Sequence, residues 1–136
     1  MNKIFVDTDI ILDLLGNREP FYIHSANLFS AADRKEISIY VSALSFANLN
    51  YILSRQYSAV QARKKLMIFK TLVTVLSITD KVIELALTSD FKDFEDAIQY
   101  YSAIENNIKV LLTRNLKDYK SALIPVLTAE QFLTNK

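Results

Sequence analysis

The chain has no cysteine, one histidine and one glycine among its 136 residues. Without cysteine it forms no disulfide, zinc–thiolate site, iron–sulfur cluster or thiol nucleophile, which is compatible with a reducing cytosol. Because His24 is the only histidine, a metal site built from several imidazoles is impossible. The single glycine also excludes the GxGxxG dinucleotide fingerprint and the P-loop, since each needs more than one glycine. These absences exclude several large enzyme classes.

Long apolar runs and a strong net charge are also missing. No stretch approaches the roughly 20 apolar residues of a membrane-spanning helix, and the first residues lack the features of a secretory signal. The formal charge of +1 gives no chain-wide electrostatic footprint for nucleic acid, although a local patch remains open. With 51% hydrophobic and 23% charged residues, the sequence predicts one soluble globular domain, and we expect it to be cytoplasmic without membrane contact.

Short apolar runs alternate with segments of helical spacing along the chain. Runs that are apolar on both faces are typical of strands in a covered parallel sheet. They occur at residues 4–6, 39–41, 73–76 and 110–112, with a shorter candidate at 125–127. Helical spacing is found at residues 21–34, 45–56, 58–70, 80–88 and 93–106. This alternation predicts βαβ units and an α/β fold with a mainly parallel sheet.

The helical segment 93–106 carries the clearest start signal. Asp93 has the position of an N-cap, and Asp96 follows three residues later in the first turn, near the positive end of the helix. Its apolar residues fall on one stripe: Phe94, Ala97, Ile98, Tyr101 and Ile104. We therefore expect a helix that buries this stripe.

Polar side chains follow the predicted strands at their carboxyl ends. Asp7 comes directly after the first strand and Thr113 directly after the fourth. Ligands bind beyond the carboxyl ends of an open parallel sheet, near the point where the strand order reverses, so these side chains should converge. Asp96 joins them if its helix begins at the same edge, and Asp118 can reach in from the loop after Thr113. Asn48 lies on the first turns of the helix after the second strand.

A group of carboxylates without matching bases is unstable unless a cation neutralises it. Mg²⁺ and Mn²⁺ prefer carboxylate, amide and water oxygens and suit phosphate substrates. The sequence therefore predicts a site in which Asp7, Asp96 and Asp118 hold the metal and Asn48 completes the site. Such an ion activates water and stabilises the leaving oxygen, which indicates hydrolysis of a phosphodiester.

Several of these residues also fit purely structural roles. Asp7 could cap the helix that begins at Thr8 or Asp9, and Asn48 could bond to a neighbouring loop. Asp118 is also a common type of turn residue. Asp9 is expected to shape the turn after the first strand, whereas Asp13, four residues further on, is expected on a solvated helix face.

Five stretches, in order, resemble the PIN domain family, close to its metal-dependent ribonucleases and VapC-like toxins: FVDTDIILDLL, YVSALSFANLNYIL, DFEDAIQYYSAIENN, LLTRNLKDYK and IPVLTAEQFL. The resemblance covers essentially the whole chain and implies a single PIN-like domain over residues 1–136, folded as a three-layer α/β/α sandwich. It implies an endoribonuclease that depends on Mg²⁺ or Mn²⁺ and acts as the toxin of a toxin–antitoxin pair. RNA as the substrate, an antitoxin protein as partner and a homodimer belong to the same expectation.

The resemblance assigns roles to single residues of this chain. Three of the family's acidic positions correspond to Asp7, Asp96 and Asp118. Thr113 and Asn115 fall in the family's T-x-D/N stretch and are expected to orient ligands or phosphate. The departure is Asn48, which stands where many members have Glu. The amide keeps an oxygen but loses a negative charge, so the cation should bind more weakly unless Asp93 supplies the missing charge.

A phosphatase of the haloacid-dehalogenase type is an alternative suggested by the opening strand and Asp-x-Asp. In that class Asp7 would be the nucleophile, Asp9 the general acid and Thr113 a phosphate ligand. The class also needs an acidic pair in a Gly-Asp context after a later strand, and the sequence has no such motif.

A PIN-like module that binds RNA or a partner protein is the non-enzymatic alternative. Asn48 would then mark the loss of catalysis. The apolar residues Phe29, Tyr57 and Phe69 are open to two interpretations, as core residues or as a face for dimerisation or antitoxin binding.

Overall fold

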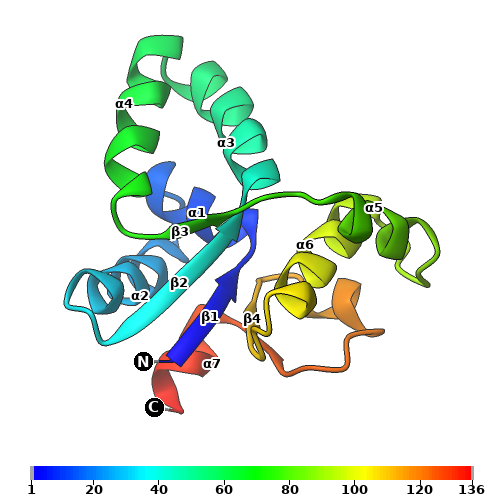
Figure 1. Ribbon diagram of the computed structural model, residues 1–136. Coiled ribbons are helices and arrows are strands. Elements are labelled where there is room, and N and C mark those ends of the chain that lie inside the picture. The colour runs from blue at the N-terminus through cyan, green and yellow to red at the C-terminus, as the bar shows by residue number, and fades with distance from the viewer. Residues whose placement is uncertain (1, 136) are drawn as a thin grey trace.

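The computed structural model describes residues 2–135, and a sheet of five parallel strands lies at its centre (Figure 1). The strands are β1 (Asn2–Val6), β2 (Ile37–Ser42), β3 (Thr74–Leu76), β4 (Leu111–Leu112) and β5 (Val126–Leu127). Their order across the sheet is β3-β2-β1-β4-β5. The predicted parallel sheet is therefore confirmed, and each of the five apolar runs contributes a strand to it.

Seven α-helices surround the sheet within residues 2–135. They are α1 (Thr8–Leu15), α2 (Tyr22–Asp33), α3 (Ala43–Gln56), α4 (Ala59–Lys70), α5 (Asp80–Leu87), α6 (Phe94–Glu105) and α7 (Ala129–Thr134), and a 3₁₀ helix spans Leu116–Tyr119. The sequence predicted the first six. It missed α7, although Thr128 and Gln131 form a capping box that begins this short helix.

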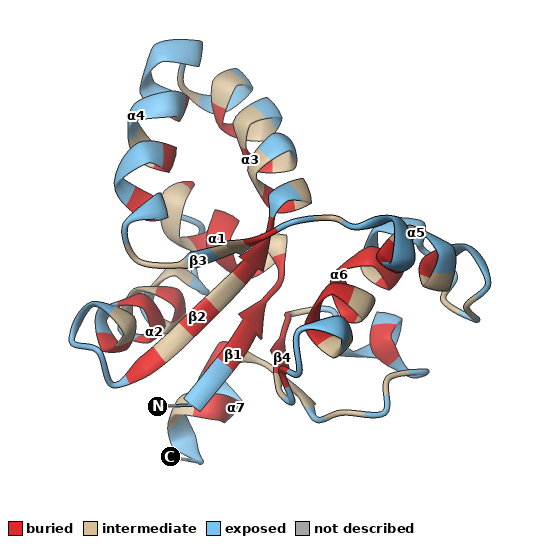
Figure 2. Ribbon diagram, in the orientation of Figure 1, coloured by how far each residue is buried: buried red, intermediate tan, exposed pale blue. Residues whose placement is uncertain are grey.

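The helices cover both faces of the sheet. Alternate residues of β1 point to opposite faces and are buried under helices on each side. Ile4 and Val6 belong to the larger core cluster, which includes residues of α1, α2, α3, α4 and α7. Phe5 packs on the other face with Tyr100 and Ala103 of α6. Figure 2 shows the buried residues along the strands and on the inner sides of the helices. This is the three-layer α/β/α sandwich that the resemblance implied.

Helix α6 is buried over a wider arc than its predicted stripe. Ala97 and Ile98 pack against α5, whereas Tyr100 faces the sheet, so the helix is covered on two sides. Gln99 is buried between these two contacts, whereas Phe94, which the stripe placed in the core, is 45% exposed. The predicted stripe was therefore only partly right, because a single amphipathic face does not describe a helix with two packing partners.

The α3–α4 hairpin extends away from the sheet (Figure 1). Its inner side joins the core through Phe69, whose ring contacts Phe29 of α2 edge-on at 5.2 Å. Phe29 and Phe69 are buried and Tyr57 is half-buried, so the interpretation of these three residues as core is confirmed. No helix between residues 2 and 135 is both long and apolar enough to cross a lipid bilayer.

Candidate active site

The strand order of the sheet reverses between β1 and β4. The chain passes from β1 outward to β2 and β3 and then returns to place β4 on the other side of β1. Asp7 follows β1 and Thr113 follows β4, and the backbone N–H of Asp7 donates to the carbonyl of Leu112 at 2.9 Å. The Thr113 hydroxyl donates to Asp7 Oδ2 at 2.9 Å. The two strand ends therefore meet as the rule for open parallel sheets predicts.

Asp7 is both a helix cap and a buried acid. Its Oδ1 accepts a hydrogen bond from the backbone N–H of Thr8 at 2.7 Å, which caps α1. Its Oδ2 accepts one from the hydroxyl of Tyr119 at 3.0 Å. The side chain is only 6% exposed. Burial raises the pKa of Asp7, although hydrogen bonds from Thr113, Thr8, Tyr119 and Gln99 oppose the shift.

Gln99 of α6 connects the ends of three elements. Its amide nitrogen donates to Thr8 Oγ1 at 3.1 Å, to Ser45 Oγ at 2.9 Å and, at 3.4 Å, to Asp7 Oδ1. Its amide oxygen accepts a hydrogen bond from Ser42 Oγ at 2.6 Å. Gln99 was not predicted, although it lies on the same helix face as Asp96, one turn later. It fixes α6 against the ends of β1 and β2.

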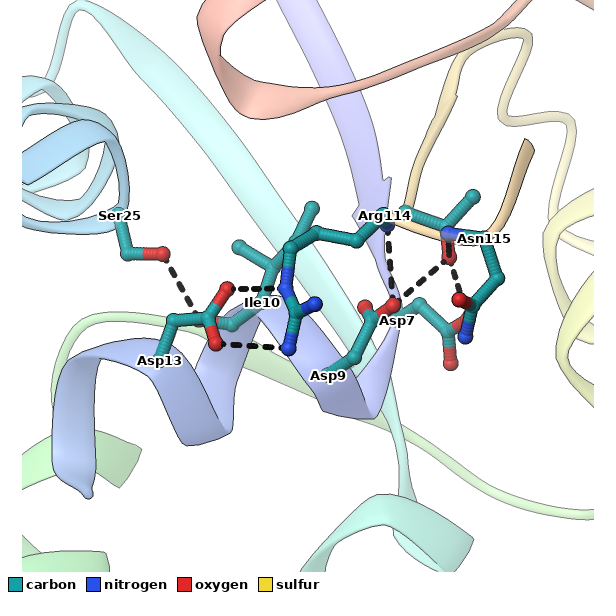
Figure 3. Close-up of polar contacts among 8 residues, drawn as sticks. Asp7, Asp9, Ile10, Asp13, Ser25, Arg114 and Asn115 are labelled. Atoms are coloured by element: carbon teal, nitrogen blue, oxygen red, sulfur yellow. Dashed lines mark hydrogen bonds and ion pairs between the residues drawn. The ribbon is translucent and has the colours of Figure 1, made fainter. Parts of the chain in front are cut away.

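Only one of the two carboxylate oxygens of Asp9 accepts hydrogen bonds. Its Oδ2 accepts hydrogen bonds from the backbone N–H of Arg114 at 3.0 Å and from Thr113 Oγ1 at 3.2 Å (Figure 3). Its Oδ1 is buried and has no hydrogen-bond partner among residues 2–135. Burial, reinforced by the charge of Asp7, raises the pKa of Asp9 to about 6. A buried carboxylate oxygen without a donor is the kind of atom that a cation satisfies.

Asp13 is buried in an ion pair, so the prediction that it faces solvent is wrong. It is 1% exposed, and the Arg114 guanidinium donates to it from Nε at 2.7 Å and from Nη2 at 3.0 Å (Figure 3). The ring of Phe21 lies 4.0 Å from Arg114 Cζ and covers the guanidinium. Burial raises the pKa of Asp13, and the hydrogen bond from Arg114 opposes the shift. Arg114 thus ties the loop after β4 to α1 at two points, Asp9 and Asp13.

A hollow of about 470 Å³ lies beyond these strand ends, and we call it the acidic hollow. Its polar lining consists of Asp7, Thr8, Asp9, Asn48, Tyr51, Asp93, Glu95, Asp96, Gln99 and Asn115. Six of the eight predicted site residues therefore line one space: Asp7, Asp9, Asn48, Asp93, Asp96 and Asn115. Thr113 lies beneath it and donates to two of its carboxylates.

Asp96 enters the acidic hollow from the first turn of α6. Asp93 caps this helix by accepting from the backbone N–H of Asp96 at 3.1 Å, which confirms the predicted cap. The Tyr119 hydroxyl contacts Asp96 Oδ1 at 3.4 Å as well as Asp7 Oδ2. Burial, followed by the charges of Asp7, Asp93 and Asp118, raises the pKa of Asp96 to about 7. Tyr119, which the sequence did not single out, therefore lies between the two central carboxylates.

Asn48 has a partner that the sequence did not suggest. Its amide nitrogen donates to Glu95 Oε1 at 2.7 Å, across the hollow from α3 to α6. Glu95 adds a carboxylate to the lining, and the sequence did not predict it, because it lies in the first turn of α6 next to Asp96 without a motif of its own.

Asp118 lies outside the acidic hollow. It is exposed and lines an adjoining space of about 440 Å³, which we call the lysine hollow. Its charged lining consists of Asp90, Lys92, Asp93, Lys117, Asp118 and Lys120. Asp93 belongs to both hollows, and Asp118 is close enough to Asp96 to contribute to its raised pKa. The role of Asp118 as a metal ligand stays a prediction.

The oxygen ligands that line the acidic hollow, carboxylates and amides, are of the type that hard divalent cations bind. No three acidic or imidazole side chains within residues 2–135 converge closely enough to form a ready-made metal site. The carboxylates of Asp7, Asp9 and Asp96 are nevertheless all held at raised pKa values by burial, and Asp9 Oδ1 is buried without a donor. A cation would neutralise these carboxylates and satisfy that oxygen.

The raised pKa of Asp96 predicts a pH-dependent stability in the absence of metal. Such a carboxyl stabilises the folded chain below its ordinary pKa of 3.8, and this contribution is lost as pH rises through about 7. Because asparagine does not ionise, Asp96→Asn should remove this loss of stability at higher pH. We expect the variant to gain about 1 kcal/mol in free energy of unfolding near pH 8, a small gain because Asp96 is only partly buried.

Urea unfolding in EDTA across this pH range measures the effect of Asp96→Asn. The control is Asp33→Asn, which neutralises an exposed acid of α2 and should leave the pH dependence of the wild type unchanged. Equal stability of Asp96→Asn and wild type at every pH would contradict the raised pKa.

The sequence profile of the PIN domain family matches residues 3–117. Ribonuclease VapC1 of Aquifex aeolicus (strain VF5) is 30% identical over 138 residues, a stretch that covers 96% of this chain and 92% of that protein. The chain therefore belongs to the PIN domain family. This confirms the resemblance found in the five ordered stretches and decides against the haloacid-dehalogenase alternative.

Solved structures share the fold at lower identity. VapBC2 of Rickettsia felis, bound to a DNA fragment from its promoter, matches with a TM-score of 0.68 and 21% identity over 92% of this chain and 96% of that chain. VapC20 of Mycobacterium tuberculosis, described as a sarcin-ricin loop cleaving toxin, matches with a TM-score of 0.64 and 20% identity over 79% and 86%. At these identities the likeness concerns the fold, and it supports the α/β/α sandwich.

Proposed function

We propose that the chain is a single PIN domain that cleaves RNA as a metal-dependent endoribonuclease and acts as the toxin of a toxin–antitoxin pair. The observation that carries the proposal is the acidic hollow at the strand-order reversal, where burial raises the pKa values of Asp7, Asp9 and Asp96. Carboxylate oxygens are the donors that Mg²⁺ and Mn²⁺ prefer, and a bound cation would favour the ionised form of these buried acids. The similarity to a protein named Ribonuclease VapC1 supports RNA as the substrate.

Asp7 and Asp96 would hold the metal ion, and Asp9 lines the same hollow beside them. Asp118 would have to turn from the lysine hollow to join them. When bound, Mg²⁺ or Mn²⁺ supplies an activated water and stabilises charge on the leaving oxygen of a phosphodiester.

Hydrogen bonds from neighbouring side chains hold the carboxylates in position. Thr113, Tyr119 and Gln99 donate hydrogen bonds that fix the rotamer of Asp7, and Tyr119 also contacts Asp96. Preorganised donors of this kind hold ligands in place without reorganisation during the reaction. Asn115, at the rim of the acidic hollow, is proposed to orient phosphate or ligands.

The lysine hollow supports a nucleic-acid substrate. Lys92, Lys117 and Lys120 place positive charge beside the acidic hollow, where they can bind the phosphates that flank a cleaved bond. Asp90, Asp93 and Asp118 line the same hollow, so the lysines offer individual contacts to phosphate and the hollow has no net positive charge.

Lys117→Ala combined with Lys120→Ala should weaken RNA binding by about tenfold at low salt and reduce its salt dependence, because fewer counterions are released. Anisotropy of a labelled single-stranded RNA in EDTA measures the affinity without cleavage. The matched control is Lys64→Ala with Lys70→Ala, which removes the same charge from exposed positions of α4. An equal loss in both double variants would show that the lysine hollow has no special role.

An antitoxin protein and a second copy of the chain are the proposed protein partners. Solved relatives of this fold include VapBC complexes, which supports an antitoxin. Exposed apolar residues on α4 also favour a protein contact, since Val60, Met67 and Ile68 are between 64% and 71% exposed. An RNA substrate and the lack of cysteine favour a cytoplasmic location.

The test is cleavage of a mixed pool of single-stranded RNA by the purified protein with Mn²⁺, with Mg²⁺ or with EDTA. The proposal predicts internal cuts with either metal and none in EDTA. Undiminished cleavage in EDTA would contradict metal dependence. No cleavage by a folded protein that also fails to bind Mn²⁺ would favour the binding-module alternative.

A further inference from the structure

Asn48 faces a carboxylate across the acidic hollow. Its Nδ2 lies 2.7 Å from Glu95 Oε1, so the side-chain nitrogen is the donor of this contact. An amide nitrogen has no lone pair available for a metal ion, and the orientation of Asn48 is thus that of a hydrogen-bond donor to an acid. The contact places a carboxylate, that of Glu95, beside the amide that was expected to complete the metal site through its oxygen.

We propose that Glu95 supplies the carboxylate that is missing at position 48 and that Asn48 is a positioning residue that holds Glu95 toward the ion. The inference rests on the proposed function, since it concerns the same metal site. In this assignment Glu95 of α6 provides the negative charge that many family members have at position 48 of α3. Asn48 provides the neutral side chain that orients Glu95.

Three observations carry this assignment. Glu95 lies in the first turn of α6 beside Asp96, and its side chain lines the same hollow as Asp7, Asp9 and Asp96. Only Oε1 of Glu95 takes the hydrogen bond from Asn48, so Oε2 is left to face a cation. The side chain is exposed at the rim, where it can reach an ion without the cost of burying a further charge.

The neutrality of Asn48 also has a physical reason in this arrangement. A glutamate at position 48 would bring a second carboxylate against Glu95, and like charges at close range repel. An amide makes an attractive contact at the same place and leaves the number of acids around the hollow unchanged.

Mn²⁺ titrations followed by electron paramagnetic resonance test the assignment without RNA or activity. We expect Glu95→Gln to weaken Mn²⁺ binding at least tenfold and Asn48→Ala to weaken it about threefold, because the acid remains but is no longer held. The double variant Asn48→Glu with Glu95→Gln reverses the amide and the acid and should bind within about threefold of wild type. Glu84→Gln, which removes the same charge from an exposed site of α5, should bind like wild type.

The outcomes separate this inference from the proposed function. If Asp96→Asn loses Mn²⁺ while Glu95→Gln binds like wild type, the metal site stands and the role of Glu95 is overturned. If Glu95→Gln weakens binding but the double variant does not recover it, the exchange of roles between positions 48 and 95 is wrong. If wild type and Asp96→Asn both fail to bind Mn²⁺, the proposed function falls, and the inference falls with it.

Discussion

Asp7→Asn should lower RNA cleavage by about a thousandfold or more, which corresponds to about 4 kcal/mol of transition-state stabilisation. Asp7 lies at the end of β1, is 6% exposed and accepts hydrogen bonds on both carboxylate oxygens. Its carboxylate is thus fixed in position and shielded from water, where the interaction with a bound cation would be screened little. Asparagine keeps the shape but removes that charge.

The folded state should survive Asp7→Asn. An asparagine oxygen can still accept from the backbone N–H of Thr8, so the cap of α1 is retained. Replacing a buried acid of raised pKa by a neutral group also removes repulsion with Asp9 and Asp96. Single-turnover cleavage with Mn²⁺, together with circular dichroism, measures both effects, and Asp33→Asn serves as the active control. Cleavage within tenfold of wild type would show that Asp7 does not hold the metal.

Arg114→Met should lower the free energy of unfolding by about 3 kcal/mol, because it leaves the Asp13 carboxylate buried without its partner. Asp13 is 1% exposed and receives both hydrogen bonds of the guanidinium fork. The loop after β4 would also lose one of its two ties to α1, although the backbone N–H of residue 114 can still donate to Asp9, so Thr113 would be held less firmly against Asp7. We therefore expect cleavage to fall together with stability.

The chain contains a matched control for Arg114→Met. Arg34 and Glu36 form the same type of fork, with Nε to Oε2 at 2.8 Å and Nη2 to Oε1 at 3.2 Å, but both side chains are largely exposed. Arg34→Met should change stability little, since exposed ion pairs are screened by water. Urea unfolding of the two variants compares a buried fork with an exposed one. A similar small effect in both would contradict the structural role assigned to Arg114.

The sheet and the position of the site could be predicted from local patterns. The five apolar runs specify strands because each must be covered on both faces, and their order along the chain specifies parallel connections. Asp7 and Thr113 then follow from a rule about strand ends alone. The cap at Asp93 was equally local, since the bond to Asp96 spans three residues. These features depend on neighbours in the sequence or on the class of fold.

The contacts within the site could not be predicted, because they join distant elements. Tyr119 meets Asp7 across 112 residues, Asn48 meets Glu95 across 47, and Arg114 meets Asp13 across 101. The spacing of Asp13 four residues after Asp9 therefore suggested a solvated face, although the partner of Asp13 comes from another loop. Only the packed arrangement shows which polar side chain turns inward.

An anomalous difference map from crystals grown with Mn²⁺ tests the central claim most directly, because it locates the ion without assuming any activity. The proposed function predicts a peak in the acidic hollow between the carboxylates of Asp7 and Asp96, and the further inference places Glu95 toward the same peak. A map with no peak there, or with a peak only in the lysine hollow beside Asp118, would contradict the metal site on which the proposed ribonuclease rests.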